Sequence, residues 1–405
     1  MAEQTHIIVG AGQAGAHAAM ALREAGFAGR ILLIGEEAHR PYERPPLSKE
    51  MLTAPAEPPP AWFHAEARYA ERGIELLLGN PVAAIEPAAH RVRLADGRVL
   101  DYAKLLLATG GRARRLAIPG GKAIHLLRTL DDARALRPLL VEGARVACIG
   151  AGVIGLEIAA AARRRGCVVS VVEAGARPMG RSLTPEFAAW IADLHRKSGV
   201  ILHFEAKIEA IEGGFVVCAS GPAVPADVVV AGIGMQRNTE LAEAAGLAVE
   251  AGIVVDEFGR SSDPDVYAAG DVAAFWHARL GRRLRLETWR HAQNHGIATG
   301  RAMAGVLEPY DEVPWFWTDQ HGVNLQMAGL PDGAVRHVLR GDMAAPSFAA
   351  FHLDAAGRVL AATGVNAPRE IRAAQAMIRA GVPVDAAALA DPATNLQRLV
   401  AGLRA

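Results

Sequence analysis

The stretch that decides the fold is residues 6–37, HIIVGAGQAGAHAAMALREAGFAGRILLIGEE. A short apolar run, Ile7–Val9, leads into the pattern Gly10-x-Gly12-x-x-Gly15. An alanine-rich segment and a second apolar run, Ile31–Ile34, follow it. This order predicts a strand, a tight turn, a helix and a second strand, which together form a unit that binds a dinucleotide.

Each glycine of this turn has its own physical role. Gly10 allows the tight turn, Gly12 lets a pyrophosphate approach the backbone, and Gly15 lets the helix pack closely on the strand. The free N–H groups at the start of the helix attract phosphate. Glu36 lies 21 residues after Gly15, where a carboxylate accepts hydrogen bonds from ribose hydroxyls.

The pattern occurs a second time in residues 145–175, RVACIGAGVIGLEIAAAARRRGCVVSVVEAG. A turn with glycines at 150, 152 and 155 precedes a helix and the strand Val168–Val172, which ends at Glu173. Glu173 is expected to bond both adenosine ribose hydroxyls and to repel a 2′-phosphate, so NADH is favoured over NADPH. The nearby cations Arg177 and Arg181 oppose that preference. One such turn can arise from packing alone, but two copies in the same context predict two dinucleotide sites.

The composition excludes several classes of protein. The chain has 405 residues, with 43 Lys+Arg against 43 Asp+Glu, so it carries no general basic field for nucleic acid. The three cysteines, Cys148, Cys167 and Cys218, are scattered and predict neither a disulfide framework nor a metal site. No apolar run is long enough to cross a membrane, and no leader precedes the first strand. A cytoplasmic protein that binds no membrane is expected.

Three further apolar segments end in polar or glycine-rich turns. Leu105–Ala108 ends in Thr109-Gly110, residues 228–231 end in Gly232-Ile233-Gly234, and Val266–Ala269 ends in Gly270-Asp271. With the two dinucleotide units, this order resembles the flavoprotein disulfide reductase superfamily. The resemblance implies that the first unit binds FAD, that the second binds NADH, and that Asp271 bonds the ribitol chain of FAD.

The same resemblance implies an α/β fold with two Rossmann-like dinucleotide-binding domains, as in glutathione reductase, and a C-terminal α/β domain. The expected ranges are 1–112 and 239–313 for the FAD-binding domain, 113–238 for the NADH-binding domain, and 314–405 for the C-terminal domain. In the last range, strands are expected at Val335–Leu339, Phe348–Leu353 and Val359–Val365, followed by a helix at Arg369–Ala380.

The loop PYERPPLSK (41–49) narrows the resemblance to the oxygenase-type NADH:ferredoxin reductases, the family of putidaredoxin reductase and biphenyl dioxygenase ferredoxin reductase. The segments LRTLDDA (127–133), ETWRHAQNHG (287–296) and PWFWTDQHGVNLQMAGL (314–330) resemble the same family. Carried over by position, the FAD contacts include Ala14, Glu36, Arg44, Pro46, Lys49, Val82, Arg128 and Trp289. The NADH contacts include the second glycine turn, Ile154, Glu157, Glu173, Arg181 and Gly232–Gly234.

The loop of residues 39–50 holds no cysteine, although disulfide reductases carry a redox-active cysteine pair near this point. A thiol relay is therefore not expected. The resemblance implies instead an ion pair between Lys49 and Glu157 beside the nicotinamide. Lys49 would stabilise the negative charge that arrives with hydride, and Glu157 would orient the nicotinamide. The alternative is that both residues are ordinary surface charges.

A helix is expected to start near Thr288, with its N-terminus toward the flavin and Trp289 at the ring edge. The chain has no cysteine set for a cluster of its own, so a flavin that returns electrons singly requires a separate [2Fe-2S] ferredoxin, which would feed a Rieske oxygenase or a cytochrome P450. The basic stretch Arg282, Arg283, Arg285 and Arg290 either steers this acidic partner or is an ordinary solvated loop. A monomer or weak homodimer is expected. Rubredoxin reductase, NADH oxidase and an NADH-responsive binding flavoprotein like apoptosis-inducing factor remain alternatives.

Overall fold

In this computed structural model the chain is described over residues 4–402 and forms two compact units. Unit 1 comprises the residues up to Pro45, Pro59–Arg112 and Met235–Glu312. Unit 2 comprises Pro46–Pro58, Ala113–Gly234 and the chain from Val313 onward. Each unit contains one dinucleotide turn, and the four domain ranges expected from the sequence remain a prediction.

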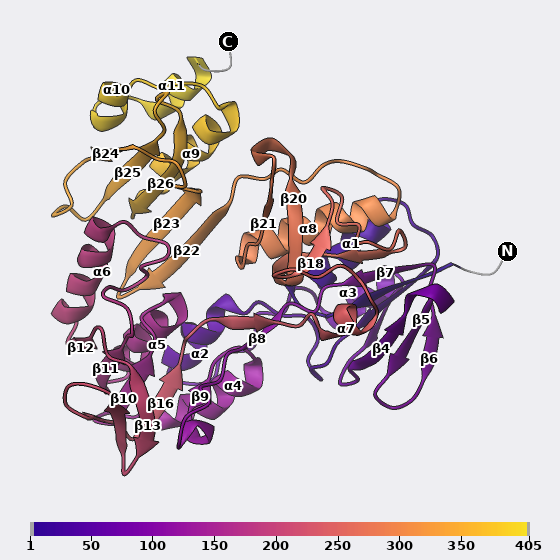
Figure 1. Cartoon of the computed structure of the whole chain (residues 1–405), viewed down its shortest axis with the longest axis horizontal. Coiled ribbons are helices and arrows are strands. Elements are labelled where there is room, and N and C mark those ends of the chain that lie inside the picture. Colours follow the sequence, from indigo (N-terminus) through magenta and orange to yellow (C-terminus); the bar gives the residue numbers. More distant parts are fainter. Residues whose placement is uncertain (1–3, 403–405) are drawn as a thin grey trace. The chain divides into compact units, whose positions relative to one another are not determined.

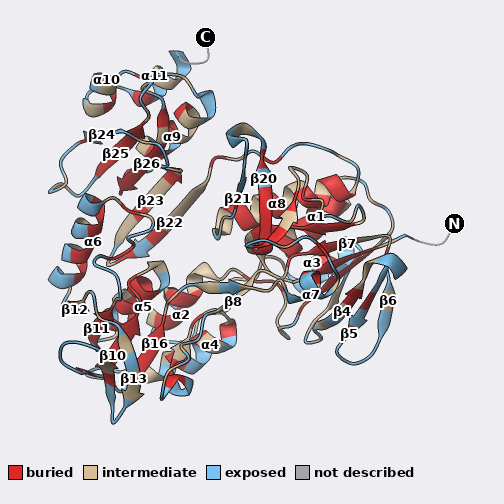
Figure 2. Ribbon diagram, in the orientation of Figure 1, coloured by how far each residue is buried: buried red, intermediate tan, exposed pale blue. Residues whose placement is uncertain are grey.

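Unit 1 is built on a five-stranded parallel sheet with the order β19-β7-β1-β2-β3, of which β7 is labelled in Figure 1. Its strands are β1 (Thr5–Val9), β2 (Arg30–Ile34), β3 (Ile74–Leu77), β7 (Lys104–Leu107) and β19 (Val266–Ala268). The first two confirm the strands predicted at Ile7–Val9 and Ile31–Ile34. Strands β1, β2 and β7 are apolar at consecutive positions because both faces of the parallel sheet are buried there; Figure 2 colours each residue by its burial.

Two helices of unit 1 lie in unusually close contact. These are α1 (Gln13–Glu24) and α8 (Trp289–Met303). A Cβ atom added to Gly296 of α8 would lie 2.3 Å from the carbonyl oxygen of Ala14, and one added to Gly300 would lie 2.4 Å from that of Ala18. The glycines therefore allow the two helix backbones to touch. The predicted helix start is confirmed, since the Thr288 hydroxyl accepts a hydrogen bond from the His291 N–H.

Smaller elements complete unit 1. One antiparallel sheet contains β4 (Val82–Glu86), β5 (Arg91–Leu94) and β6 (Val99–Asp101), and another sheet contains β18 (Ile253–Val255), β20 (Ala273–His277) and β21 (Arg282–Leu284). The short helices are α3 (Glu66–Glu71) and α7 (Glu240–Ala244). The short strands β8 (Gly111–Ala113) and β17 (Met235–Arg237) lie where the chain passes from one unit to the other.

Unit 2 repeats the first topology in a second five-stranded parallel sheet, ordered β12-β11-β10-β16-β9. Its strands are β9 (His125–Leu126), β10 (Arg145–Ile149), β11 (Val168–Val172), β12 (Val200–His203) and β16 (Val228–Ala231). The helices are α2 (Glu50–Thr53), α4 (Leu130–Leu136), α5 (Val153–Arg164) and α6 (Pro185–Lys197), and a small sheet contains β13 (Ile208–Glu212), β14 (Phe215–Cys218) and β15 (Val224–Pro225). As in unit 1, the strand before the glycine turn is central.

The C-terminal part of unit 2 is an antiparallel sheet ordered β22-β23-β26-β25-β24 (Figure 1). It comprises β22 (Trp315–Gln320), β23 (Val323–Gly329), β24 (Arg336–Arg340), β25 (Phe348–Leu353) and β26 (Val359–Val365), with helices α9 (Pro368–Ala380), α10 (Ala386–Ala390) and α11 (Leu396–Gly402). The three strands and the helix expected here are confirmed, with ends shifted by at most one residue.

The hairpin β22–β23 was not among the expected strands. The two buried residues of β22 are polar, Thr318 and Gln320, while the aromatic residues Trp315, Phe316 and Trp317 are only half-buried. This reverses the usual alternation of apolar and polar residues, so the sequence does not read as a strand. The two-residue turn His321-Gly322 has φ of +51° and +78°, as in the tightest β-hairpins.

Candidate functional site

In the first glycine turn, only Gly12 has open space where a side chain would begin. Gly10 has φ of +110°, and its added Cβ would lie 2.2 Å from the Ala108 carbonyl oxygen. A Cβ on Gly15 would lie 1.9 Å from the carbonyl oxygen of Gly10, whereas a Cβ on Gly12 would meet nothing within 4 Å. Gly12 is the N-cap of helix α1, which has no side-chain cap and no acidic residue in its first turn. Its N–H groups are therefore available to an anion.

The carboxyl ends of the parallel strands bring the other predicted residues of unit 1 to this turn. Gly270 has φ of +77°, and its added Cβ would lie 2.8 Å from the Cβ of Ala14. The Thr109-Gly110 segment follows β7, where the Thr109 hydroxyl donates to the Asn238 carbonyl oxygen at 2.8 Å. Glu36 is exposed directly after β2, and Asp271 follows Gly270.

One polar side chain in this cradle supports a bound dinucleotide. Both polar atoms of the Gln13 amide, at the first residue of α1, are buried and make no hydrogen bond within the described protein. A buried amide without a partner is costly, so a ligand or water is expected at this helix end. Together with the space at Gly12, this fits a pyrophosphate and hence the FAD predicted for unit 1.

The remaining predicted FAD contacts fall in both units. Unit 1 contains Ala14, Arg44, Val82 and Trp289, whereas unit 2 contains Pro46, Lys49 and Arg128. The Arg44 guanidinium lies 2.6 Å from Glu37 Oε1, and the Tyr42 hydroxyl donates to Glu37 Oε2 at 2.5 Å. This fixes the Arg44 side chain near the carboxyl end of β2.

A buried histidine supports the Gly270-Asp271 turn. The N–H of Gly270 donates to His295 Nδ1 at 3.2 Å, so the neutral ring carries its proton on Nε2. Only 1 % of His295 is exposed, and burial lowers its pKa to about 3. The rings of Phe275, His291 and Tyr310 surround it. His295 therefore positions the turn as a neutral acceptor.

This buried histidine predicts a pH-dependent stability. Because the pKa is lowered on folding, the unfolded chain binds more protons below pH 6.5, and stability is lost as the pH falls. Between pH 7 and 5, His295 should account for a loss of about 2 kcal/mol. Urea unfolding of wild type and of His295→Gln should show a smaller loss in the variant. Equal losses would contradict a neutral buried His295.

The second glycine turn has the same construction. A Cβ on Gly155 would lie 1.9 Å from the carbonyl oxygen of Gly150, and one on Gly150 would lie 2.7 Å from that of Gly232. Gly152 has only an ordinary contact, at 3.7 Å. Ile154 is exposed in the first turn of α5. The Gly232–Gly234 segment, predicted to bind NADH, thus lies against the turn.

Glu173 is fixed at the end of β11 by the backbone. Its Oε2 accepts from the Ala151 N–H at 2.7 Å, and its Oε1 accepts from the Gly175 N–H at 2.6 Å. The carboxylate therefore stands beside the glycine turn, where the sequence predicts an adenosine ribose. Arg181 is exposed, and its guanidinium reaches within 4.0 Å of the Cβ position of Gly234.

The predicted ion pair between Lys49 and Glu157 is present. Lys49 Nζ lies 2.9 Å from Glu157 Oε1, and the Ser48 hydroxyl donates to Oε2. The Thr318 hydroxyl donates to Oε1 at 2.6 Å. Only 4 % of Glu157 is exposed, so the alternative of an ordinary surface charge is wrong for this residue. A buried carboxylate needs such compensation.

The proline-rich loop explains how Lys49 reaches Glu157. Pro45–Ser48 form a short 3₁₀ turn, and the Lys49 N–H donates to the Pro46 carbonyl oxygen at 3.1 Å. The fixed φ of each proline restricts this backbone, so Ser48 and Lys49 both point to the same carboxylate. Neither Ser48 nor Thr318 is predicted as a site residue from the sequence. Ser48 is adjacent to Lys49, but nothing in the sequence indicates Thr318.

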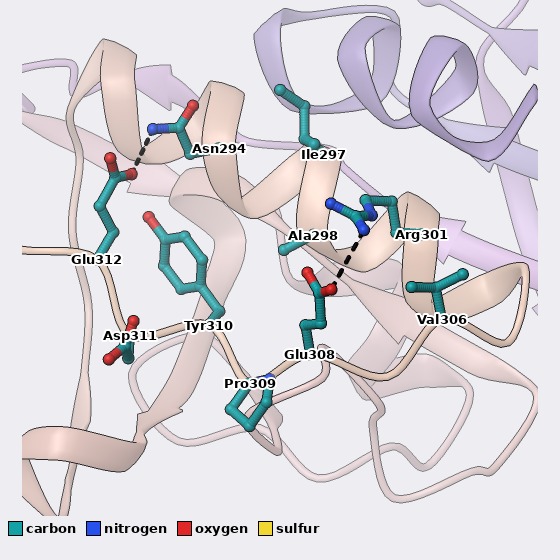
Figure 3. A pocket seen from close by; sticks show the side chains of 10 residues that line it. All are labelled: Asn294, Ile297, Ala298, Arg301, Val306, Glu308, Pro309, Tyr310, Asp311 and Glu312. Atoms are coloured by element: carbon teal, nitrogen blue, oxygen red, sulfur yellow. Dashed lines mark hydrogen bonds and ion pairs between the residues drawn. The ribbon is translucent and has the colours of Figure 1, made fainter. Parts of the chain in front are cut away.

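A hollow in unit 1 is lined by residues other than those of the predicted site. It has a volume of about 440 Å³ and is bordered by α8 and residues 306–312 (Figure 3). Arg301 and Glu308 form an ion pair at 3.3 Å on its wall. No predicted site residue lines it. Across residues 4–402, no group of three or more histidine, cysteine or carboxylate side chains is arranged to hold a metal ion, and no helix is long and apolar enough to cross a membrane.

Comparisons with known proteins agree with this arrangement. Residues 4–296 match the family model for pyridine nucleotide-disulphide oxidoreductases, and residues 315–400 match the reductase C-terminal model. The chain is 43% identical to the anthranilate 1,2-dioxygenase system ferredoxin–NAD(+) reductase component of Burkholderia cepacia, covering 98% of this chain and 99% of the relative. It is 37% identical to putidaredoxin reductase of Pseudomonas putida, with 98% and 97% covered.

Two solved structures are similar over nearly the whole chain. The covalent putidaredoxin reductase–putidaredoxin complex matches with a TM-score of 0.95 at 37% identity, covering 100% of both chains. The ferredoxin reductase for the CYP199A2 system of Rhodopseudomonas palustris matches with a TM-score of 0.94 at 37% identity, covering 98% of this chain and 100% of the other.

Proposed function

The chain belongs to the pyridine nucleotide-disulphide oxidoreductase family, and from that premise we propose that it is an FAD-dependent, NADH-dependent ferredoxin reductase. It takes hydride from NADH and passes electrons singly to a [2Fe-2S] ferredoxin that serves a Rieske oxygenase or a cytochrome P450. The observation that carries this proposal is the buried Lys49–Glu157 pair next to the second glycine turn. The relative from Burkholderia cepacia is the ferredoxin–NAD(+) reductase component of a dioxygenase system, and the relative from Pseudomonas putida is a putidaredoxin reductase.

The two cofactors have separate binding residues. FAD would be held by the Gly10–Gly15 turn, Glu36 and the Gly270-Asp271 turn of unit 1, and bound FAD supplies the conversion between two-electron and one-electron transfer. NADH would be held by the Gly150–Gly155 turn, with Glu173 on the adenosine ribose. The fixed Glu173 carboxylate supports NADH over NADPH, because a 2′-phosphate would be repelled.

Lys49 and Glu157 have complementary roles in the proposal. Lys49 provides a positive charge that stabilises negative charge arriving from NADH. Glu157 fixes the Lys49 ammonium group at 2.9 Å. Its carboxylate also orients the nicotinamide, which holds the reactants in the geometry that the reaction requires. Both groups are preorganised, because Glu157 already accepts three hydrogen bonds from the protein, one of them at Oε2, and a carboxylate has about four acceptor sites.

The cysteines do not support a thiol relay. Cys148 and Cys167 are buried, and burial raises the pKa of Cys148 to about 12 and that of Cys167 above its usual value. A neutral buried thiol is a poor nucleophile. The half-buried Cys218 lies on β14, in the small sheet of β13, β14 and β15. Electrons must therefore leave to a separate carrier.

A basic surface beside α8 supports an acidic partner. Arg282, Arg283 and Arg285 are exposed on and after β21, and Trp276 on the paired strand β20 is 39% exposed. Exposed charges of one sign speed the encounter with a partner of opposite charge, and salt screens them. Arg290 and Arg283 contribute less, because Arg290 lies 3.4 Å from Glu312 and Arg283 lies 3.9 Å from Glu250.

Stopped-flow mixing of the FAD-loaded protein with NADH and a [2Fe-2S] ferredoxin tests the proposal. Rapid loss of flavin absorbance followed by ferredoxin reduction is expected, with a second-order rate constant for ferredoxin that falls as salt is added. NADPH should reduce the flavin much more slowly. Flavin bleaching with no transfer to any ferredoxin would overturn the proposal and favour an NADH-responsive binding protein.

A further inference from the structure

We propose that Thr318, Gln320, His195 and His321 form a one-directional hydrogen-bond chain that positions the Glu157 carboxylate, so that the C-terminal sheet is part of the nicotinamide site. All four residues belong to unit 2, on β22, its turn and α6. The inference rests on the proposed function, because it assumes that Glu157 orients the nicotinamide.

The negative charge of Glu157 sets the direction of the hydrogen-bond chain. An ionised carboxylate only accepts hydrogen bonds, so the single hydroxyl proton of Thr318 is donated to Glu157 Oε1, at 2.6 Å. Thr318 is 0 % exposed, so no solvent competes for this proton. Its oxygen is then left as an acceptor for the next residue.

Gln320 continues the same direction. Its Nε2 donates to Thr318 Oγ1 at 3.0 Å, which turns its Oε1 toward His195. His195 Nε2 lies 2.8 Å from that oxygen and must carry a proton, because an amide oxygen cannot donate. Gln320 is 2 % exposed and His195 is 0 % exposed. The series of hydrogen bonds therefore sets the orientation of the Gln320 amide and the tautomer of His195.

The chain ends at the half-buried hairpin turn. Burial lowers the pKa of His195, so its ring is neutral and its Nδ1 is an acceptor. His321 Nε2 lies 3.2 Å from that atom and donates to it. Burial, followed by the neighbouring His195, lowers the pKa of His321 to about 4. At neutral pH the chain therefore keeps one direction, with every proton pointing toward Glu157.

The aligned hydrogen bonds strengthen the contact between Thr318 and Glu157. Hydrogen bonds aligned in one direction polarise one another and strengthen the last member, which is the bond from Thr318 to the carboxylate. Lys49 and Thr318 both bind Oε1, and Ser48 binds Oε2, so the Thr318 bond is one of three that together hold the carboxylate in place. Thr318 and Gln320 are thus positioning residues, since neither is expected to touch the nucleotide.

Binding measurements on the FAD-loaded protein test this role with Thr318→Val, which keeps the shape and removes the hydroxyl, and Thr318→Ser, which keeps the hydroxyl. The two ligands are tetrahydro-NADH, a non-reducing analogue, and ADP-ribose, which lacks the nicotinamide. Thr318→Val should bind tetrahydro-NADH about 10-fold more weakly, the size of coupling typical of residues in contact within one hydrogen-bond network. It should bind ADP-ribose as wild type does, and Thr318→Ser should bind both normally.

Gln320→Leu provides a second variant, since it removes the donor to Thr318 at similar volume, and the same selective loss is expected. Unchanged binding of tetrahydro-NADH by both variants would overturn the positioning role. Equal losses for both ligands would also overturn it, because they would show a general effect on the fold. If wild type binds neither ligand, the proposed function itself fails instead.

Discussion

Lys49→Ala is expected to lower the rate constant for flavin reduction by NADH about 100-fold, the usual effect of removing one preorganised electrostatic group from a reaction site. The loss should appear at saturating NADH, because the charge acts on the arriving hydride more than on binding. Rapid mixing with NADH, followed by flavin absorbance, measures this constant directly. Lys122→Ala, at an exposed lysine of unit 2, serves as the control and should react like wild type.

The double variant Lys49→Met/Glu157→Gln separates electrostatics from folding. Lys49→Ala alone leaves a buried carboxylate without its cation, which also costs stability. The double variant removes both charges, so its stability should recover while flavin reduction stays slow. Recovery of the rate in the double variant would contradict the role proposed for Lys49, because it would show that the single variant failed through the uncompensated Glu157.

Gly12→Ala should produce a stable protein that binds FAD poorly. The backbone of Gly12 has φ of −84°, which alanine adopts, and its Cβ would meet no protein atom within 4 Å. Stability of the FAD-free chain should therefore change by no more than about 1 kcal/mol. The methyl group would occupy the space of the pyrophosphate and prevent its hydrogen bonds to the backbone. FAD affinity should fall by about 10-fold to 100-fold.

Gly15→Ala serves as the comparison, because it should lower the stability of the FAD-free protein, which Gly12→Ala should leave nearly unchanged. Its Cβ would lie 1.9 Å from the carbonyl oxygen of Gly10, so the helix must move from the strand, at a cost of about 1–3 kcal/mol or more. FAD content after purification and thermal unfolding of the FAD-free chain distinguish the two variants. Normal FAD content in Gly12→Ala would show that the pyrophosphate does not approach this residue.

The sequence determined the parts of the protein that depend on local spacing. The glycine turns at 10–15 and 150–155 follow from steric limits within a few residues, because a Cβ at Gly15 or Gly155 overlaps a backbone oxygen of the same turn. The consecutive apolar residues of β1 and β2 likewise identify buried parallel strands. The roles of FAD, NADH and the ferredoxin came from family resemblance rather than from spacing.

Only the tertiary structure decided which polar residues meet. Lys49 and Glu157 are 108 positions apart, and Thr318 is 161 positions from Glu157, so no local pattern connects them. The family resemblance supplied the first pair but not Ser48, Thr318 or Gln320. Strand β22 was not predicted, because some of its buried positions are polar. They are polar because the Glu157 carboxylate needs hydrogen-bond donors, which apolar side chains cannot provide. Steric limits act between residues close in sequence, so short spacings reveal them. The hydrogen-bond partners of a buried charge come from residues far apart in sequence, so only the folded structure shows them.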